Sequence, residues 1–143
     1  MAYCILADIL DQVEEPRLIQ LTDDDGLGTI GTVRVDKAIS DADEEIDGYV
    51  GSRYTVPLNP APAILRKLAV DIAVYNLFAR RDKAPEGRTE RYKAAVRFLE
   101  QVALGKISLG AADPDGNPPA SDAPQMSSEN PRRLFDRNTM RGF

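Results

Sequence analysis

Histidine is absent from the 143-residue sequence, and cysteine occurs once, as Cys4. Without histidine, the chain lacks the side chain that most often acts as a general base near neutral pH and most often binds transition metals. A single cysteine cannot form an internal disulfide, and a lone buried cysteine usually behaves as a small hydrophobic residue. These absences argue against most hydrolase and zinc mechanisms, and they fit a reducing compartment.

Long apolar runs and cofactor motifs are also missing. The apolar N-terminal stretch has no basic residues before it and is interrupted by Asp8, too early for a signal peptide or a transmembrane span. The segment Gly26-Leu27-Gly28 lacks the strand, helix, lysine and hydroxyl residues of a phosphate-binding loop. We therefore expect no export, no membrane insertion and no cofactor.

Acidic residues are abundant, but their spacing does not match a metal site or a catalytic pair. An EF-hand that started at Asp23 would place Leu27 at loop position 5 and Arg34 at position 12, where oxygen ligands are required. Acidic pairs such as Glu44 and Glu45 fit a solvated helix face better than general acid and base groups. We expect a turn at Asp23, no metal site and no enzymatic activity.

Apolar residues recur at helical spacing in residues 35–50, 63–79 and 92–104. A shorter stretch of the same kind covers residues 5–13, and Pro16 then ends or restarts that helix. Residues 29–35 and 53–56 are candidates for short extended segments. The pattern predicts an all-α fold, in which residues 1–109 form a small bundle of three to five helices.

The composition changes after Gly110. Residues 111–128 contain hardly any large apolar side chain and cannot bury enough surface to offset the entropy of the chain. The last residues combine arginines with large apolar side chains, which are types enriched in strong interfaces. This candidate partner-binding set is Arg132, Arg133, Leu134, Phe135, Arg137, Met140, Arg141 and Phe143. We predict that residues 110–143 form an extended tail that orders on a partner; the alternative is a disordered end with accidental apolar residues.

The charge is divided unevenly along the chain. Residues 1–54 carry 13 acidic and 4 basic side chains, whereas residues 55–109 carry 5 acidic and 10 basic ones. Two halves of opposite charge can pair with each other within one fold, or they can lie on different faces and attract other copies of the chain head to tail. The candidate inter-subunit residues are Asp41, Glu44, Glu45, Arg88 and Arg91. Direct DNA binding is disfavoured, because the isoelectric point is about 4.8 and no aromatic residues interleave the basic ones in a stacking pattern.

Several segments in this order resemble a family of small neck-region proteins of Mu-like phages and prophages, over roughly three quarters of the chain. These segments are residues 2–10, 18–26, 38–49, 53–58, 68–73, 92–95 and 105–110. The helical order is also similar to that of the head-completion adaptors of long-tailed phages. Those adaptors are helical bundles that form a ring, usually of twelve subunits, beneath the portal.

The resemblance implies a structural virion protein, made in the host cytoplasm and located at the neck between head and tail. It would form a twelve-subunit ring that joins the portal to the stopper or tail-terminator protein, with packaged DNA passing through the channel without specific binding. The portal is the expected partner of the tail, and a neighbouring subunit is the alternative. The composition by itself equally permits a soluble helical regulator or assembly factor that binds another protein.

Overall fold

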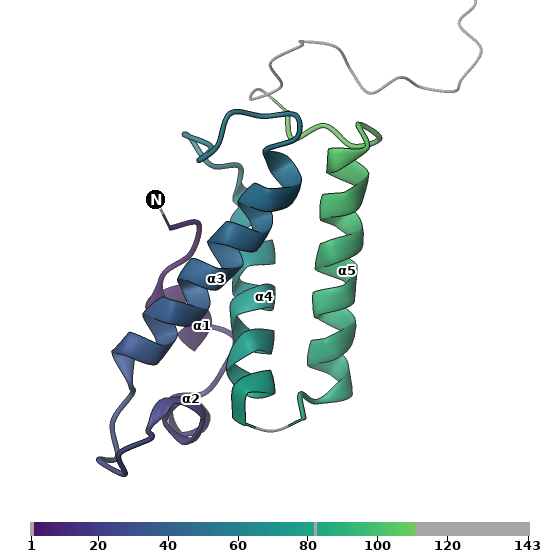
Figure 1. Cartoon of the computed structure of the whole chain (residues 1–143). Helices are drawn as coiled ribbons and strands as arrows, with labels where there is room; N and C mark the ends of the chain where they lie inside the picture. The colour runs from purple at the N-terminus through teal and green to yellow at the C-terminus, as the bar shows by residue number, and fades with distance from the viewer. Residues whose placement is uncertain (1, 82, 111–143) are drawn as a thin grey trace, which may run out of the picture.

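The computed structural model describes residues 2–81 and 83–110 and contains five α-helices in that part of the chain (Figure 1). The helices are α1 (Leu6–Leu10), α2 (Glu15–Thr22), α3 (Thr32–Val50), α4 (Ala63–Arg81) and α5 (Glu86–Ala103). The described residues contain no strand. The all-α prediction is therefore confirmed.

Prolines mark the start of three of these helices. Pro16 lies in the first turn of α2, while Pro62 and Pro85 immediately precede α4 and α5. Proline suits these places because its ring presets the backbone angle and its missing N–H would have no partner there. At the other end of α4, Arg80 and Arg81 lie in the last turn, where positive charge interacts favourably with the helix dipole.

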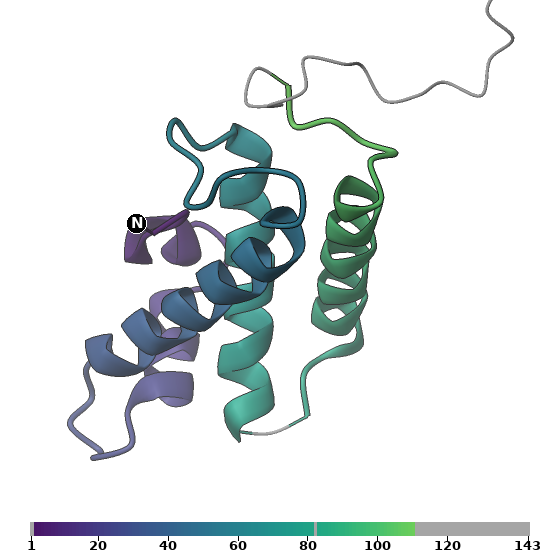
Figure 2. The same ribbon diagram turned by 45° about the horizontal axis from the view of Figure 1, so that its top comes forward.

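The core lies between α3, α4 and α5, each of which contacts the other two. Helix α3 contributes one apolar stripe and α5 a narrower one, whereas α4 buries residues over most of its circumference. The fully buried side chains of the core include Ile46, Leu65, Ile72, Leu77 and Leu99. The expected packing of residues 35–50, 63–79 and 92–104 against one another is confirmed. Helices α1 and α2 cover a further side of α4 (Figure 2).

Two tyrosines fasten the loop segments to one end of the bundle. The hydroxyl of Tyr3 donates a hydrogen bond to Asp47 on α3 and accepts one from the backbone N–H of Leu58, at 2.5 and 3.1 Å. The hydroxyl of Tyr54 accepts a hydrogen bond of 3.0 Å from the backbone N–H of Leu109. Both tyrosines are buried. The N-terminal segment, the connection between α3 and α4, and residues 104–110 are thereby tied together.

The expectation of extended segments was wrong for the first candidate. Helix α3 begins at Thr32, so half of residues 29–35 is helical, with Val35 buried in the core. Its β-branched residues suggested an extended strand, but burying the apolar stripe of α3 outweighs that weak preference. Residues 53–56 form part of the turn after α3 and pair with no strand.

None of the helices in residues 2–81 and 83–110 combines the length and apolar character needed to cross a membrane.

Replacing Ile72 by Asp tests the central position of α4. The side chain of Ile72 is fully buried, so a carboxylate there would lose its hydration without gaining a partner. We expect a loss of about 3–5 kcal/mol in the free energy of unfolding, enough to unfold a marginally stable domain. Circular dichroism and urea titration measure it, with Ala79→Asp on the exposed side of α4 as the control. A helical, cooperatively folded Ile72→Asp variant would contradict this account of the core.

Candidate interaction surfaces

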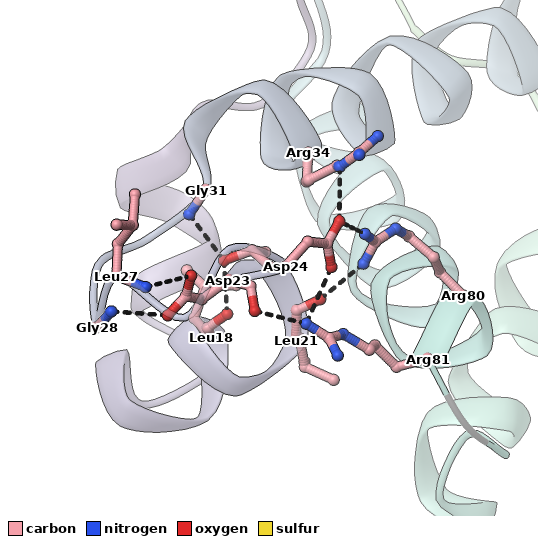
Figure 3. A network of polar contacts seen from close by, with 11 residues as sticks. Leu18, Leu21, Asp23, Asp24, Leu27, Gly28, Gly31, Arg34, Arg80 and Arg81 are labelled. Carbon is pink, nitrogen blue, oxygen red and sulfur yellow. Dashed lines mark hydrogen bonds and ion pairs between the residues drawn. The ribbon is translucent and has the colours of Figure 1, made fainter.

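The acidic loop between α2 and α3 is held by its own carboxylates. Asp23 accepts hydrogen bonds from the backbone N–H groups of Leu27 and Gly28, at 3.0 and 2.7 Å (Figure 3). Gly26 and Gly28 adopt positive φ angles, which residues with side chains rarely tolerate. These bonds lower the pKa of Asp23. Within the described ranges, no group of three or more potential ligands is placed to hold a metal ion.

Asp24 connects this loop to the end of α4. Its carboxylate pairs with Arg34 at 2.9 Å, with Arg81 at 2.9 Å and with Arg80 (Figure 3). The hydrogen bond from Arg80 is the main reason why the pKa of Asp24 is lowered. The same two α4 arginines also donate to the backbone carbonyls of Leu21 and Asp23. Part of the basic charge of the second half of the chain is therefore neutralised inside the subunit.

The two arginines predicted to contact a neighbouring subunit also have partners within the chain. Arg88 donates to the backbone carbonyl of Gln12 at 2.7 Å, and Arg91 donates to the Gln12 side chain at 3.0 Å. Burial lowers the pKa of the Arg88 guanidinium. Arg91 also lies 4.0 Å from the buried carboxylate of Asp71. Both side chains fasten α5 to the segment that follows α1.

The three predicted acidic contact residues differ from one another. Asp41 pairs with Lys37 one turn earlier on α3. Glu45 accepts a 2.9 Å hydrogen bond from the hydroxyl of Tyr92 on α5, and burial raises the pKa of that phenol to about 12. The ring of Tyr92 stacks on Tyr75 with centroids 4.2 Å apart. Glu44 is exposed, and in the described part of the chain it forms neither a hydrogen bond nor an ion pair.

Charges without a close partner lie on different helices. Asp36 and Glu44 on α3, Arg66 on α4 and Arg97 on α5 are exposed, and none forms a hydrogen bond or ion pair within residues 2–81 and 83–110. Glu86 and Glu100 on α5 are likewise exposed and form no hydrogen bond or ion pair among the described residues, so α5 carries unpaired charges of both signs. The sequence identified Glu44, but it could not show that Arg97 is free while Arg88 and Arg91 are engaged.

A groove separates the N-terminal segment from α3, and sequence reasoning missed it. Its volume is ≈ 480 Å³, and it is lined by Ala2, Cys4, Ile5, Leu6, Asp36, Ile39, Ser40, Asp43, Glu44 and Asp47. No lysine or arginine is among these lining residues. Burial raises the pKa of the Asp43 carboxyl and raises that of the Cys4 thiol to about 12. The acidic residues spaced along α3 indicated a negatively charged surface. Only the folded position of the N-terminal segment shows that this surface is one wall of a groove.

Both ends of the bundle carry exposed apolar side chains. Leu27 and Val33 are 73% and 75% exposed at the end where the acidic loop lies. Leu104 is 68% exposed at the opposite end, where α5 finishes (Figure 1). Exposed apolar side chains are common singly, but Leu27 in the loop and Val33 in the first turn of α3 line the same pocket and are a candidate contact for another protein.

The predicted partner-binding residues of the tail, from Arg132 to Phe143, lie outside the described residues.

The Asp24 junction predicts a specific dependence of stability on pH. The pKa of this carboxyl is below its ordinary 3.8 in the folded state, so its contribution is fully present above pH 3.8 and is lost as the pH falls through the lower value. We expect Asp24→Asn to lower the urea midpoint at pH 7, and the difference from the unmodified chain to shrink towards pH 3. The neighbouring Asp25→Asn is the control, because Asp25 has no such partners among the described residues. Equal effects of the two substitutions would contradict the role of Asp24.

Comparison with known proteins matches the chain to phage proteins. The family model described as "Bacteriophage Mu, Gp36" matches residues 3–128. The Mu-like prophage FluMu protein gp36 of Haemophilus influenzae is 36% identical over 115 residues, which is 80% of this chain and 79% of the relative. Gene product J of Escherichia phage Mu is 34% identical over 113 residues, which is 76% of this chain and 74% of the relative. The predicted relationship to Mu-like phages is confirmed: the chain is a phage protein and belongs to the bacteriophage Mu Gp36 family.

Proposed function

We propose that this protein is a structural, non-catalytic adaptor in the neck of a tailed phage virion. Copies of the chain form a ring, of twelve subunits by analogy with the adaptors that the helical order resembles. One end of the ring binds the portal and the other binds the stopper or tail-terminator protein. Packaged DNA passes through the channel without specific contacts.

The observation that carries this proposal is the distribution of unpaired charge. Asp36 and Glu44 on α3 are free of close partners in the described chain, and so is Arg97 on α5. A ring of identical subunits requires two different, complementary surfaces on each copy. The carboxylates of Asp36 and Glu44 and the guanidinium of Arg97 supply such a pair, and their attraction would steer and align neighbouring copies, although Glu86 and Glu100 on α5 are unpaired as well.

The two apolar ends support contacts with two different proteins. Leu27 and Val33 lie at one end of the bundle, and Leu104 lies at the other. A subunit that joins two partners must present a contact surface to each. Side chains buried at the centre of an interface contribute much of its affinity, so these residues are the candidates for contacts along the ring axis.

A second candidate function is that of a regulator or assembly factor, which binds a phage protein but does not stay in the particle. The exposed apolar residues at the ends fit this role as well. The two functions differ in stoichiometry, because a structural component is present in purified virions in a fixed number of copies. Quantitative mass spectrometry of virions distinguishes them.

Ring assembly should depend on salt and on Arg97. We expect the purified chain to form rings at low salt and to dissociate as salt rises, with unchanged helical content, because exposed charges are screened. Arg97→Glu should raise the concentration needed for assembly, whereas Arg66→Glu, the same charge change on α4, should not. Light scattering and negative-stain imaging measure this. A chain that stays monomeric under all conditions and is missing from virions would overturn the proposal.

The apolar ends should act separately. Leu27→Asp should abolish binding at one end of the ring and Leu104→Asp binding at the other, since a carboxylate in an apolar interface loses its hydration. Both side chains are exposed, so folding and ring formation should persist. Pull-down with purified portal and with stopper protein measures each contact, and Thr29→Asp in the same loop as Leu27 is the control. If neither variant lost either partner, the assignment of the two ends would be wrong.

A further inference from the structure

The groove between the N-terminal segment and α3 combines an apolar floor with an acidic rim. Leu6, which is partly buried, and Ile5, which is 60% exposed, provide its apolar surface, and the almost fully buried Cys4 and Ile39 also line it. The rim consists of the carboxylates of Asp36, Asp43, Glu44 and Asp47. Its volume of ≈ 480 Å³ lies within the range that accommodates small ligands, so it is large enough for a few side chains of a peptide.

The acidic rim is only partly neutralised within the subunit. Asp43 and Asp47 accept hydrogen bonds from the backbone N–H and the hydroxyl of Tyr3, both neutral donors, and the positive charge of the N-terminus acts to lower the pKa of Asp43. Asp36 and Glu44 have no close partner among the described residues. The unpaired carboxylates of Asp36 and Glu44 are therefore available to pair with positively charged groups of an occupant.

The chain itself contains a segment with complementary chemistry. Residues 130–143 carry four arginines and one acidic residue, together with Leu134, Phe135 and Met140. Arginine pairs with carboxylates through directed, charge-assisted hydrogen bonds, and large apolar side chains can fill a small apolar floor. The family model matches residues 3–128, so this basic segment lies beyond the matched part of the chain.

The intervening chain is long enough to connect two subunits. Twenty-one residues separate Gly110 from Arg132. Such a segment spans up to about 70 Å when extended, and about 25 Å on average as a random coil. Either length reaches from one small domain to the next.

The position of the groove favours a neighbouring copy as the donor of this segment. The described chain ends at Gly110, next to Leu109, which is bonded to Tyr54 at the end of the bundle where α3 and α5 finish. The groove is lined by the N-terminal segment and α3. That segment lies on the side of α3 away from α5 (Figures 1 and 2). The exit of the tail and the groove lie on different sides of the subunit, as the two surfaces of a head-to-tail contact do, so a neighbouring copy can place its groove beside that exit.

We propose that the groove binds residues 130–143 of a second copy of this chain, with Leu134 and Phe135 on the apolar floor and the arginines against the acidic rim. This inference rests on the proposed ring and names a contact within it. Each copy gives its tail to one neighbour and receives the tail of the other. A closed ring then contains one such contact per subunit. Because all of these contacts must break before the ring comes apart, avidity stabilises the ring even if each contact is weak.

Disulfide trapping between two versions of the full chain tests the contact. Both versions carry Cys4→Ala; one adds Ser40→Cys in the groove, and the other adds Leu134→Cys and a size tag. Ser40 is exposed and lines the groove, so its substitution should not disturb the core. We expect mild oxidation of the mixture to yield a disulfide-linked heterodimer on a non-reducing gel. If Cys4→Ala fails to fold, the native residue can stay, because the Cys4 thiol is buried and its pKa of about 12 makes it poorly reactive.

Matched controls separate docking from chance collision. Ala79→Cys replaces Ser40→Cys on another exposed surface, and Ser121→Cys replaces Leu134→Cys earlier in the tail; both should give little heterodimer. In samples that imaging shows to contain rings, Asp36→Arg should lower the trapping yield roughly tenfold, since like charges would then face each other across the groove. Combining Asp36→Arg with Arg132→Asp and Arg133→Asp should restore much of the yield.

The outcomes distinguish this inference from the proposed function. Heterodimer yields equal to those of the controls, in samples that imaging shows to contain rings, would overturn the tail contact and leave the ring intact. An internal disulfide in a dilute chain carrying both cysteines, without heterodimer in the mixture, would show that the tail docks on its own subunit and would also overturn it. If no rings form and the chain is missing from virions, the proposed function is wrong, and so is the tail contact that rests on it.

Discussion

The structure depends on the burial of α4. This helix contacts α1, α2, α3 and α5, and it buries residues around most of its circumference. Without α4, helices α3 and α5 would lose most of the surface that covers their apolar stripes. Helices α1 and α2 are too short to replace it. The burial of α4 leaves little of its own surface for partners. The surfaces that can recognise other proteins are therefore on α3, on α5 and at the ends of the bundle.

Sequence periodicity predicted most of this fold. The three long helices and their common core follow from apolar residues at helical spacing, and Pro16, Pro62 and Pro85 lie where helices begin. The start of α3 was missed because the β-branched residues of Thr29 to Val35 favour an extended chain locally. Packing of Val35 against the core decides their conformation, and that contact is not visible in a local pattern.

The candidate site was less predictable, because charge partners depend on the fold. The sequence correctly showed two halves of opposite charge, but it could not say which charges meet within one subunit. Asp24 collects three arginines from distant positions, and Arg88 and Arg91 contact Gln12. The groove forms only where the N-terminal segment and α3, some thirty residues apart in the sequence, lie side by side. Patterns within a single segment could not predict it. The assignment of the tail to a neighbour rather than to the portal arises only once that groove is known.

The polar ties at the two ends of the bundle have a mechanical consequence. At one end Tyr3 and Tyr54 connect the loops to α3 and to residues 104–110, and at the other end Asp24 connects the α2–α3 loop to α4. A force applied to either end is thus shared among several helices at once instead of peeling one helix from the core. Such a subunit should transmit tension along its long axis as a stiff rod.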